Sequence, residues 1–139
     1  MDTISRSQRS ALMAGVRVKD TKPEIVVRRL LYRLGYRFRV CRKDLPGKPD
    51  VVLPKWKTAI LVHGCFWHQH EGCPKAARPT TNVEFWDRKL DRNVERDKED
   101  VAGLTALGWR VLVVWECRIR DLSSLSAELE AFIKEAAVI

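Results

Sequence analysis

PDVVLPKWKTAILVHGCFWHQHEGC, residues 49–73, contains two apolar segments followed by a loop rich in cysteine and histidine. The first segment, DVVLP (50–54), is short and follows proline and glycine turn residues, which is typical of a strand. The second, WKTAILVHG (56–64), is almost continuously apolar, as a central strand covered on both faces would be. We therefore expect two neighbouring strands here, with the polar loop leaving the buried one.

The segment before these strands predicts a helix with a defined start and end. Thr21 is a candidate N-cap, and Glu24 three residues later completes a capping box. Gly35 stands where a C-terminal cap is expected. The apolar residues between them recur with helical spacing: Ile25, Val26, Leu30, Leu31 and Leu34.

Apolar periodicity predicts the remaining elements, and their order indicates the fold class. They are a short basic helix at 5–15, an alternating strand at 36–42, a long charged helix at 82–107 that ends at Gly108, a buried strand at 109–117 and a closing helix at 122–137. Helices and strands in this order favour an α/β fold, in which a small mixed β-sheet has helices on both faces.

Composition narrows the class of partner. The chain has 139 residues and a net charge of +8, with 45% hydrophobic and 32% charged residues. This is typical of one globular domain, and the charge favours a polyanion as partner, although an ordinary basic protein carries similar charge. No run of 18 apolar residues predicts a membrane span, and the polar N-terminus does not resemble a signal peptide. In a reducing compartment, four cysteines indicate metal binding or free thiols before disulfides.

A candidate zinc site lies in the loop after the second strand. Cys65, His70 and Cys73 are spaced C-x4-H-x2-C, and Cys117 ends a later strand that can lie beside the one ending at His63. Thiolates with an imidazole suit tetrahedral zinc. The alternative is a set of unrelated buried thiols with a loop histidine. The remaining Cys41 is expected to be a buried free thiol.

A carboxylate and two further histidines indicate nuclease chemistry. Asp50 opens one strand, and His63 and His68 follow the end of its neighbour. In many magnesium nucleases such a carboxylate holds a cation that polarises the phosphate, and a histidine near neutral pKa serves as general base. The alternative is that Asp50 is a turn residue after Pro49.

Phe66 and Trp67 lie between the candidate metal ligands, and Trp86 opens the long helix. In a basic protein, an exposed aromatic pair can stack on bases or enter between them. The alternative is that the three rings pack over the loop as a small satellite core.

These segments resemble the very-short-patch mismatch repair (Vsr) endonucleases. The resemblance covers about 110 residues, to Cys117, and rests on RSALMAGVRVKDTKPE (9–24), LPGKPDVVLP (45–54), HGCFWH (63–68), EFWDRKLDRNVERD (84–97) and LGWRVLVVWEC (107–117). It implies a restriction-endonuclease-like fold with a zinc-stabilised loop. It also implies a Mg²⁺-dependent, strand-specific nick in duplex DNA, 5′ to the T of a T:G mismatch left by deamination of 5-methylcytosine.

The resemblance assigns roles to residues around the catalytic metal. Asp50 corresponds to the magnesium-binding aspartate, and Val62 to the residue whose main-chain carbonyl is the next metal contact. Glu24 corresponds to an acidic residue that approaches the metal through water, which competes with its place in the capping box. Val62 also departs from the family pattern, because threonine is the residue we would compare with it.

The resemblance also implies catalytic and DNA-binding groups. His68 corresponds to the general base, His63 to the histidine that supports the scissile phosphate, and Asp97 to an acidic residue associated with both. The residues expected to enter the DNA beside the mismatch are Phe66, Trp67, Trp86 and, from the N-terminal arm, Met13. Two further departures are HQHEGC (68–73), one residue longer than its counterpart, and PKAARPTTN (74–82), which does not align.

Organisation and partners follow from the same resemblance. We expect a DNA-contacting arm at 1–20 and a single endonuclease domain at 21–139, acting as a monomer in the bacterial cytoplasm at the nucleoid. Expected partners are mismatched duplex DNA, a cytosine-5 DNA methyltransferase that acts in the same cell, and mismatch-repair proteins, with no membrane. Two alternatives remain, namely a restriction-like nuclease of other specificity and a zinc-stabilised DNA-binding module without catalysis.

Overall fold

The computed structural model describes residues 21–40 and 42–137, so the predicted helix at 5–15, the arm at 1–20, Met13 and Cys41 lie outside the described residues. Every element predicted between 21 and 137 is present, although the strand expected at 36–42 is only two residues long. The helices and strands are α2 (Lys22–Arg33), β1 (Arg39–Val40), β2 (Val51–Leu53), β3 (Thr58–His63), α3 (Val83–Ala106), β4 (Arg110–Trp115) and α4 (Leu122–Ala137).

The four strands form one mixed sheet in the order β1-β2-β3-β4. β2 pairs antiparallel with β1 and β3, with Val51 opposite Ile60. β3 and β4 are parallel, with His63 opposite Trp115, and α3 supplies the crossover that a parallel pair requires. β3 is therefore an interior strand, as its apolar sequence predicts.

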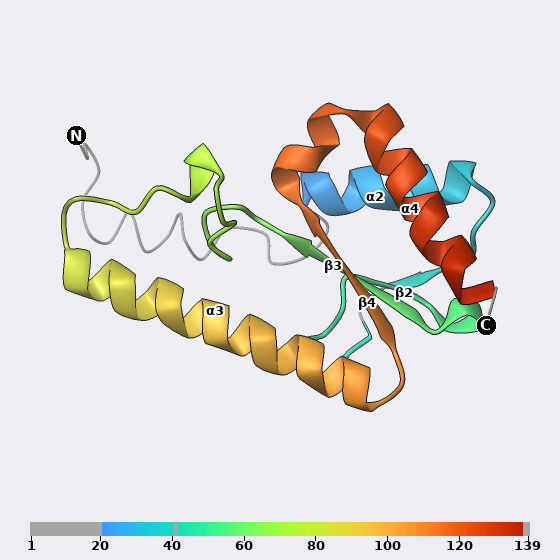
Figure 1. The fold of residues 1–139 in the computed structure, drawn as a ribbon, viewed down its shortest axis with the longest axis horizontal. Coiled ribbons are helices and arrows are strands. Elements are labelled where there is room, and N and C mark those ends of the chain that lie inside the picture. The colour runs from blue at the N-terminus through green and yellow to red at the C-terminus, as the bar shows by residue number, and fades with distance from the viewer. Residues whose placement is uncertain (1–20, 41, 138–139) are drawn as a thin grey trace.

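Helices cover both faces of the sheet (Figure 1). α2 and α4 lie together on one side, and the long α3 crosses the other. Side chains alternate between these layers along each strand. Val51, Leu53, Ile60 and Val114 pack with α2 and α4, whereas Val52, Ala59 and Leu61 pack with Leu104 of α3. The predicted mixed sheet between helices is confirmed.

The helix ends agree with the sequence except at one cap. Gly35 and Gly108 both have positive φ, +88° and +89°, immediately after α2 and α3, where glycine adopts this conformation most easily. Thr21 occupies the N-cap of α2, but its side chain makes no capping hydrogen bond. The Thr21 half of the predicted capping box is therefore wrong, whereas Glu24 is buried and paired with Arg28. Among the described helices, none is long and apolar enough to cross a membrane.

The turn before β2 is fixed against α3. Leu45 is buried with the residues of the α3 layer, and Pro46 lies close to Gly103. At Gly47 the backbone passes so near α3 that an added Cβ would lie 2.7 Å from Cβ of Asp100. This close approach fixes the chain just before Asp50.

Gly47→Ala should therefore destabilise the protein by at least about 2 kcal/mol, since the methyl group meets the helix and φ is +71°. Gly35→Ala is the matched control, because its φ is also positive but no atom lies within 4 Å of the added Cβ. It should cost about 1 kcal/mol. Urea unfolding followed by tryptophan fluorescence measures both, and equal losses would contradict the close approach.

Candidate active site and metal centre

A buried and a half-buried carboxyl group lie close together at the start of β2. Asp50 Oδ2 accepts a 2.7 Å hydrogen bond from the main-chain N–H of Val62 on β3. Glu24, only 4% exposed, projects from the first turn of α2, where Arg28 Nη2 lies 3.3 Å from its Oε2. Glu24 lies close enough to Asp50 for its negative charge to act on the Asp50 carboxyl group. The structure thus brings together two of the predicted metal-site residues.

Burial makes this pair costly while both groups are charged. Desolvation, opposed by the hydrogen bond from the Val62 N–H and reinforced by the negative charge of Glu24, raises the pKa of Asp50 to about 7. Paired carboxylate oxygens are the donors that Mg²⁺ prefers, so the residues fit a divalent cation. The structure ties Val62 to Asp50 through its N–H, and the predicted role of the Val62 carbonyl stays a prediction.

Two histidines and a carboxylate lie where β3 ends. His63 and His68 stack with ring centroids 3.9 Å apart and planes at 7°. His68 Nδ1 lies 2.7 Å from Oδ2 of Asp97, which α3 presents from the opposite wall. A cavity of about 660 Å³ opens beside the three residues. Asp97 is close to the histidines as predicted, and its role in catalysis stays a prediction.

His63 and His68 differ in their surroundings. His63 is buried, and its ring lies at 75° to the ring of Trp115 with ring centroids 5.2 Å apart. Desolvation, with a smaller contribution from nearby His68, lowers the pKa of His63 to about 3. His63 is therefore neutral near neutral pH. His68 is about 30% exposed and hydrogen-bonded to a carboxylate, so its second ring nitrogen is the one left to face a substrate.

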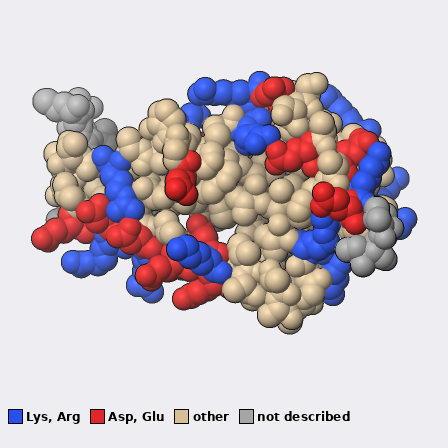
Figure 2. All heavy atoms as spheres, viewed as in Figure 1, with Lys and Arg blue, Asp and Glu red and all other residues tan. Residues whose placement is uncertain are grey.

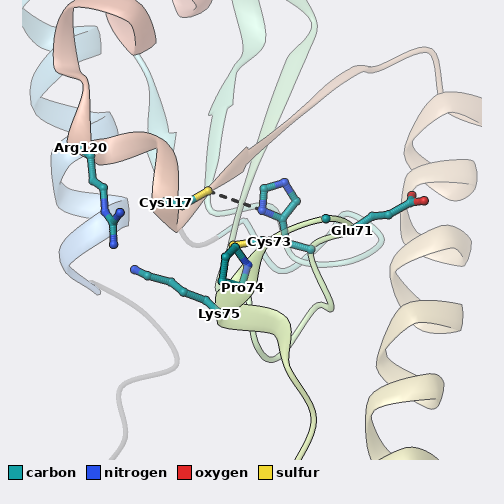
Figure 3. A pocket seen from close by; sticks show the side chains of 8 residues that line it. Glu71, Cys73, Pro74, Lys75, Cys117 and Arg120 are labelled. Atoms are coloured by element: carbon teal, nitrogen blue, oxygen red, sulfur yellow. Dashed lines mark hydrogen bonds between the residues drawn. The ribbon is translucent and has the colours of Figure 1, made fainter.

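The four candidate zinc ligands converge, and Figure 3 shows two of them, Cys73 and Cys117. One donor atom from each of Cys65, His70, Cys73 and Cys117 lies within 4.8 Å of the other three. Cys65 and Cys117 Sγ each lie 3.5 Å from His70 Nδ1. In Figure 3, Cys73 and Cys117 lie beside this ring, whereas Glu71 points away toward α3. A Cys₃His set within this span fits a tetrahedral metal ion such as zinc.

The surroundings of this centre hold its ligands in place. Cys65 is fully buried and its N–H donates to Glu116 Oε1 at 3.0 Å. Burial raises the pKa of the Cys65 thiol to about 12, so a cation is needed to hold it as a thiolate. The His70 ring stacks on Trp115 at 4.2 Å. Because His63 contacts the same indole, Trp115 links the Cys/His centre to the histidine pair.

The three predicted DNA-entering aromatics form a cluster. Phe66 lies edge-on to Trp67 and to Trp86, with ring centroids 5.1 and 5.6 Å apart, and the two tryptophans are 6.0 Å apart. All three are half-buried. Phe85 joins the cluster through Trp86 and is 57% exposed. The rings thus pack together and still present apolar surface. This arrangement agrees both with contact to DNA bases and with a small satellite core over the loop.

Charges of both signs line the long helix. Figure 2 shows acidic and basic side chains alternating along α3 on the face in view. The helix surface is therefore not a uniformly basic track for a DNA backbone.

The fold defines the class of architecture, which is that of a known nuclease catalytic domain. The catalytic domain of the homing endonuclease I-Bth0305I shares the architecture with a TM-score of 0.58, covering 84% of this chain and 98% of that chain at 21% identity. This likeness confirms the predicted restriction-endonuclease-like fold.

Sequence comparisons then identify the family. The family model for "DNA mismatch endonuclease Vsr" matches residues 1–75. The Type II nicking enzyme V.XorIIP of Xanthomonas oryzae pv. oryzae is 48% identical over 128 residues, which is 92% of this chain and 93% of that protein. DNA mismatch endonuclease Vsr of Escherichia coli is 42% identical over 127 residues, which is 91% of this chain and 81% of that protein. The chain belongs to the Vsr family of DNA mismatch endonucleases.

Sequence reasoning missed the side chains that support the site. Trp115 and Glu116 appear in the sequence only as part of a buried strand, and the pairing of β4 with β3 is what brings them to His63 and Cys65. Arg78, in the segment that does not align, binds two acidic residues of α3. The one available signal is the i, i+4 spacing of Asp87 and Asp91, which places both on one helix face.

The Cys/His centre predicts one tightly bound zinc ion per chain. Cys73→Ser should abolish this binding and lower the melting temperature by several degrees, because metal binding is coupled to folding of the loop. Native mass spectrometry and thermal unfolding measure the two effects. Cys41→Ser is the control and should retain the metal; loss of metal in both variants, or in neither, would contradict the assigned ligands.

The Asp50 carboxyl predicts a stability change with pH. The Asp50 carboxyl of the folded protein holds its proton up to about pH 7, whereas in the unfolded chain it releases the proton near the ordinary aspartate pKa of 3.8. Without divalent cations, the protein should therefore lose stability as pH rises from about 4 to about 7. Asp50→Asn cannot ionise and should be more stable than wild type at pH 8, by on the order of 2–4 kcal/mol, with little difference at pH 4.

Urea unfolding at both pH values checks this expectation. Asp44→Asn serves as the control, because Asp44 is an exposed carboxylate whose pairing with Arg42 holds its pKa low, at about 2. It should show no gain in stability at pH 8. A similar gain in both variants would mean that general charge, not burial of Asp50, is responsible.

Proposed function

We propose that this endonuclease nicks one strand of duplex DNA on the 5′ side of the T in a T:G mismatch that arises from deamination of 5-methylcytosine. The observation that carries the proposal is the arrangement at the end of β3. Asp50 and Glu24 form a carboxylate pair, His68 is bound to Asp97, and the chain of Val62 and His63 connects the two groups. The edge-on pair of aromatic rings, Phe66 and Trp67, follows directly in the same loop.

His68 is the proposed general base. A carboxylate only accepts hydrogen bonds, so Asp97 fixes the proton of His68 on Nδ1 and leaves the lone pair on Nε2. Nε2 can then take a proton from the attacking water. Asp97 also stabilises the imidazolium that forms, as a buried carboxylate does beside a catalytic histidine.

His63 is the proposed phosphate support, acting as a neutral group. Its low pKa means that it contributes a ring N–H to a phosphate oxygen rather than a positive charge. Asp50 and Glu24 would hold the divalent ion, with Val62 contributing its carbonyl. When bound, Mg²⁺ supplies Lewis-acid polarisation of the phosphate and activation of water. The two carboxylates would hold that ion on the side of β3 from which His63 would contact the phosphate.

The aromatic cluster supports mismatch selection. Phe66 and Trp67 immediately precede His68, so entry of these rings into the base stack would place the general base at a defined distance along the strand. Opening a mismatched step costs less than opening a matched one, so the entry step itself favours T:G. Met13 is proposed to reach the DNA from the N-terminal arm, and the Cys/His centre, holding zinc, fixes the loop.

The family setting supports the remaining proposals. A cytosine-5 DNA methyltransferase would create the target base, and we propose action as a monomer on chromosomal DNA in the bacterial cytoplasm, followed by repair proteins. A second candidate is a nuclease of other DNA specificity. Its support is that several relatives, V.XorIIP among them, are named Type II nicking enzymes.

A nicking assay tests the proposal directly. End-labelled duplexes carrying one T:G mismatch in CC(T/A)GG, and their matched counterparts, are incubated with Mg²⁺ and with wild type, Asp50→Asn, His68→Ala or Asp44→Asn. Wild type and Asp44→Asn should nick only the mismatched duplex, 5′ to the T. Asp50→Asn and His68→Ala should reduce the rate at least about 100-fold, as expected for loss of a metal ligand or a general base.

The other outcomes separate the alternatives. Cleavage of matched duplex would favour the restriction-like nuclease. Binding without cleavage by wild type would favour a non-catalytic module. Val62→Thr then shows whether a hydroxyl at this position changes the rate; an unchanged rate agrees with a contribution from the main chain alone.

A further inference from the structure

Arg78 connects the Cys/His loop to the first turns of α3 through three directional contacts. Its Nε donates to Gln69 Oε1 at 2.9 Å, its Nη1 lies 2.9 Å from Asp87 Oδ1, and its Nη2 lies 2.6 Å from Asp91 Oδ1. Asp87 and Asp91 are one helical turn apart. One planar guanidinium therefore spans a helix face and a loop side chain at once.

Gln69 extends these contacts to the backbone that carries the aromatic rings. Its Nε2 donates to the carbonyl oxygens of Phe66, at 2.8 Å, and of Ala76, at 3.1 Å. Gln69 has φ +52°, an unfavourable region for a residue with a side chain. From α3, Asn93 Nδ2 donates to the carbonyl of Trp67 at 3.2 Å. Side chains thus hold the carbonyls of both loop aromatics.

This network lies apart from the hydrophobic core. The Arg78 side chain is 32% exposed, and Asp87 and Asp91 are 47% and 65% exposed. Ion pairs at such exposure contribute little to stability. Its geometric effect is more specific, because Phe66 and Trp67 come from the loop and Trp86 comes from α3, directly before Asp87. The network therefore fixes the loop and α3, which hold these rings, relative to each other.

We propose that Arg78 and Gln69 are positioning residues that clamp the loop to α3, so that Phe66, Trp67 and Trp86 form one preassembled unit for entering the DNA stack. The inference rests on the proposed function. Rings held together before binding lose less conformational freedom on entry, so more of their contact energy is available to open the mismatched step. The loop residue after Trp67 is His68, so the same clamp sets the general base.

The sharpest test removes the acidic partners rather than the arginine. Asp87→Asn/Asp91→Asn makes the protein more basic, so electrostatics alone should tighten binding to DNA of any sequence. The proposed clamp predicts a loss, not a gain, in the two steps that are specific to the mismatch, namely entry of the rings and nicking. A T:G duplex with 2-aminopurine beside the mismatch should show a smaller fluorescence increase at saturating protein, and the single-turnover nicking rate should fall at least about fivefold because the rings are misplaced.

Two further variants make the test independent of charge and folding. Arg78→Lys keeps the charge but cannot bridge Gln69, Asp87 and Asp91 together, and should reproduce both losses. Arg42→Lys is the matched control, since Arg42 pairs with Asp44 through two contacts away from the aromatic cluster, and should behave as wild type. Melting temperature and metal content should stay close to wild type in all variants, which separates positioning from unfolding.

Specific results overturn the inference. Faster nicking by Asp87→Asn/Asp91→Asn, with undiminished 2-aminopurine fluorescence, would show that Arg78 is a phosphate contact restrained by the two acids. If wild type produces no fluorescence increase, the aromatic rings do not enter the DNA stack and the inference fails. If wild type raises the fluorescence but does not nick, the proposed cleavage fails, and the fluorescence amplitudes of the variants still decide the role of the clamp.

Discussion

The parallel pairing of β3 and β4 is the constraint on which the rest of the structure depends. Its register sets His63 opposite Trp115, and so brings Cys117 to the loop that begins at Cys65. The crossover between the two strands has to pass over one face of the sheet, and α3 does so. That path carries Asp97 to His68 and Trp86 to Phe66. A different register would move the Cys/His ligands apart and would also separate the aromatic rings of the loop from Trp86.

The fold was largely predictable because its signals are local. Gly35 and Gly108 ended two helices as expected, and the apolar segment at 56–64 became an interior strand. The Cys/His spacing also anticipated which ligands would meet. Other features depend on tertiary packing. Glu24 fits a capping box by sequence, yet the burial of α2 against the sheet turns it toward Asp50. The Arg78 network joins segments that no periodicity relates.

The site concentrates groups that oppose folding. Asp50 and Glu24 are two acids held close together and largely out of water, His63 is kept neutral by burial, and Gln69 holds an unfavourable backbone conformation. The surrounding layers of valine, leucine and isoleucine offset these costs. Such a division is common in enzymes, where rigid packing maintains arrangements that the isolated groups would avoid.

The Cys/His centre has a consequence for synthesis of the chain. Three of its four ligands lie in one loop, whereas Cys117 follows only after the whole of α3 and β4. On the ribosome, the loop emerges first with an incomplete coordination sphere, and the fourth thiol arrives when the parallel strand pair can form. Closure of the centre is thus tied to completion of the sheet. A chain truncated before β4 lacks both the strand pair and Cys117, so partial products do not have the complete set of four candidate ligands.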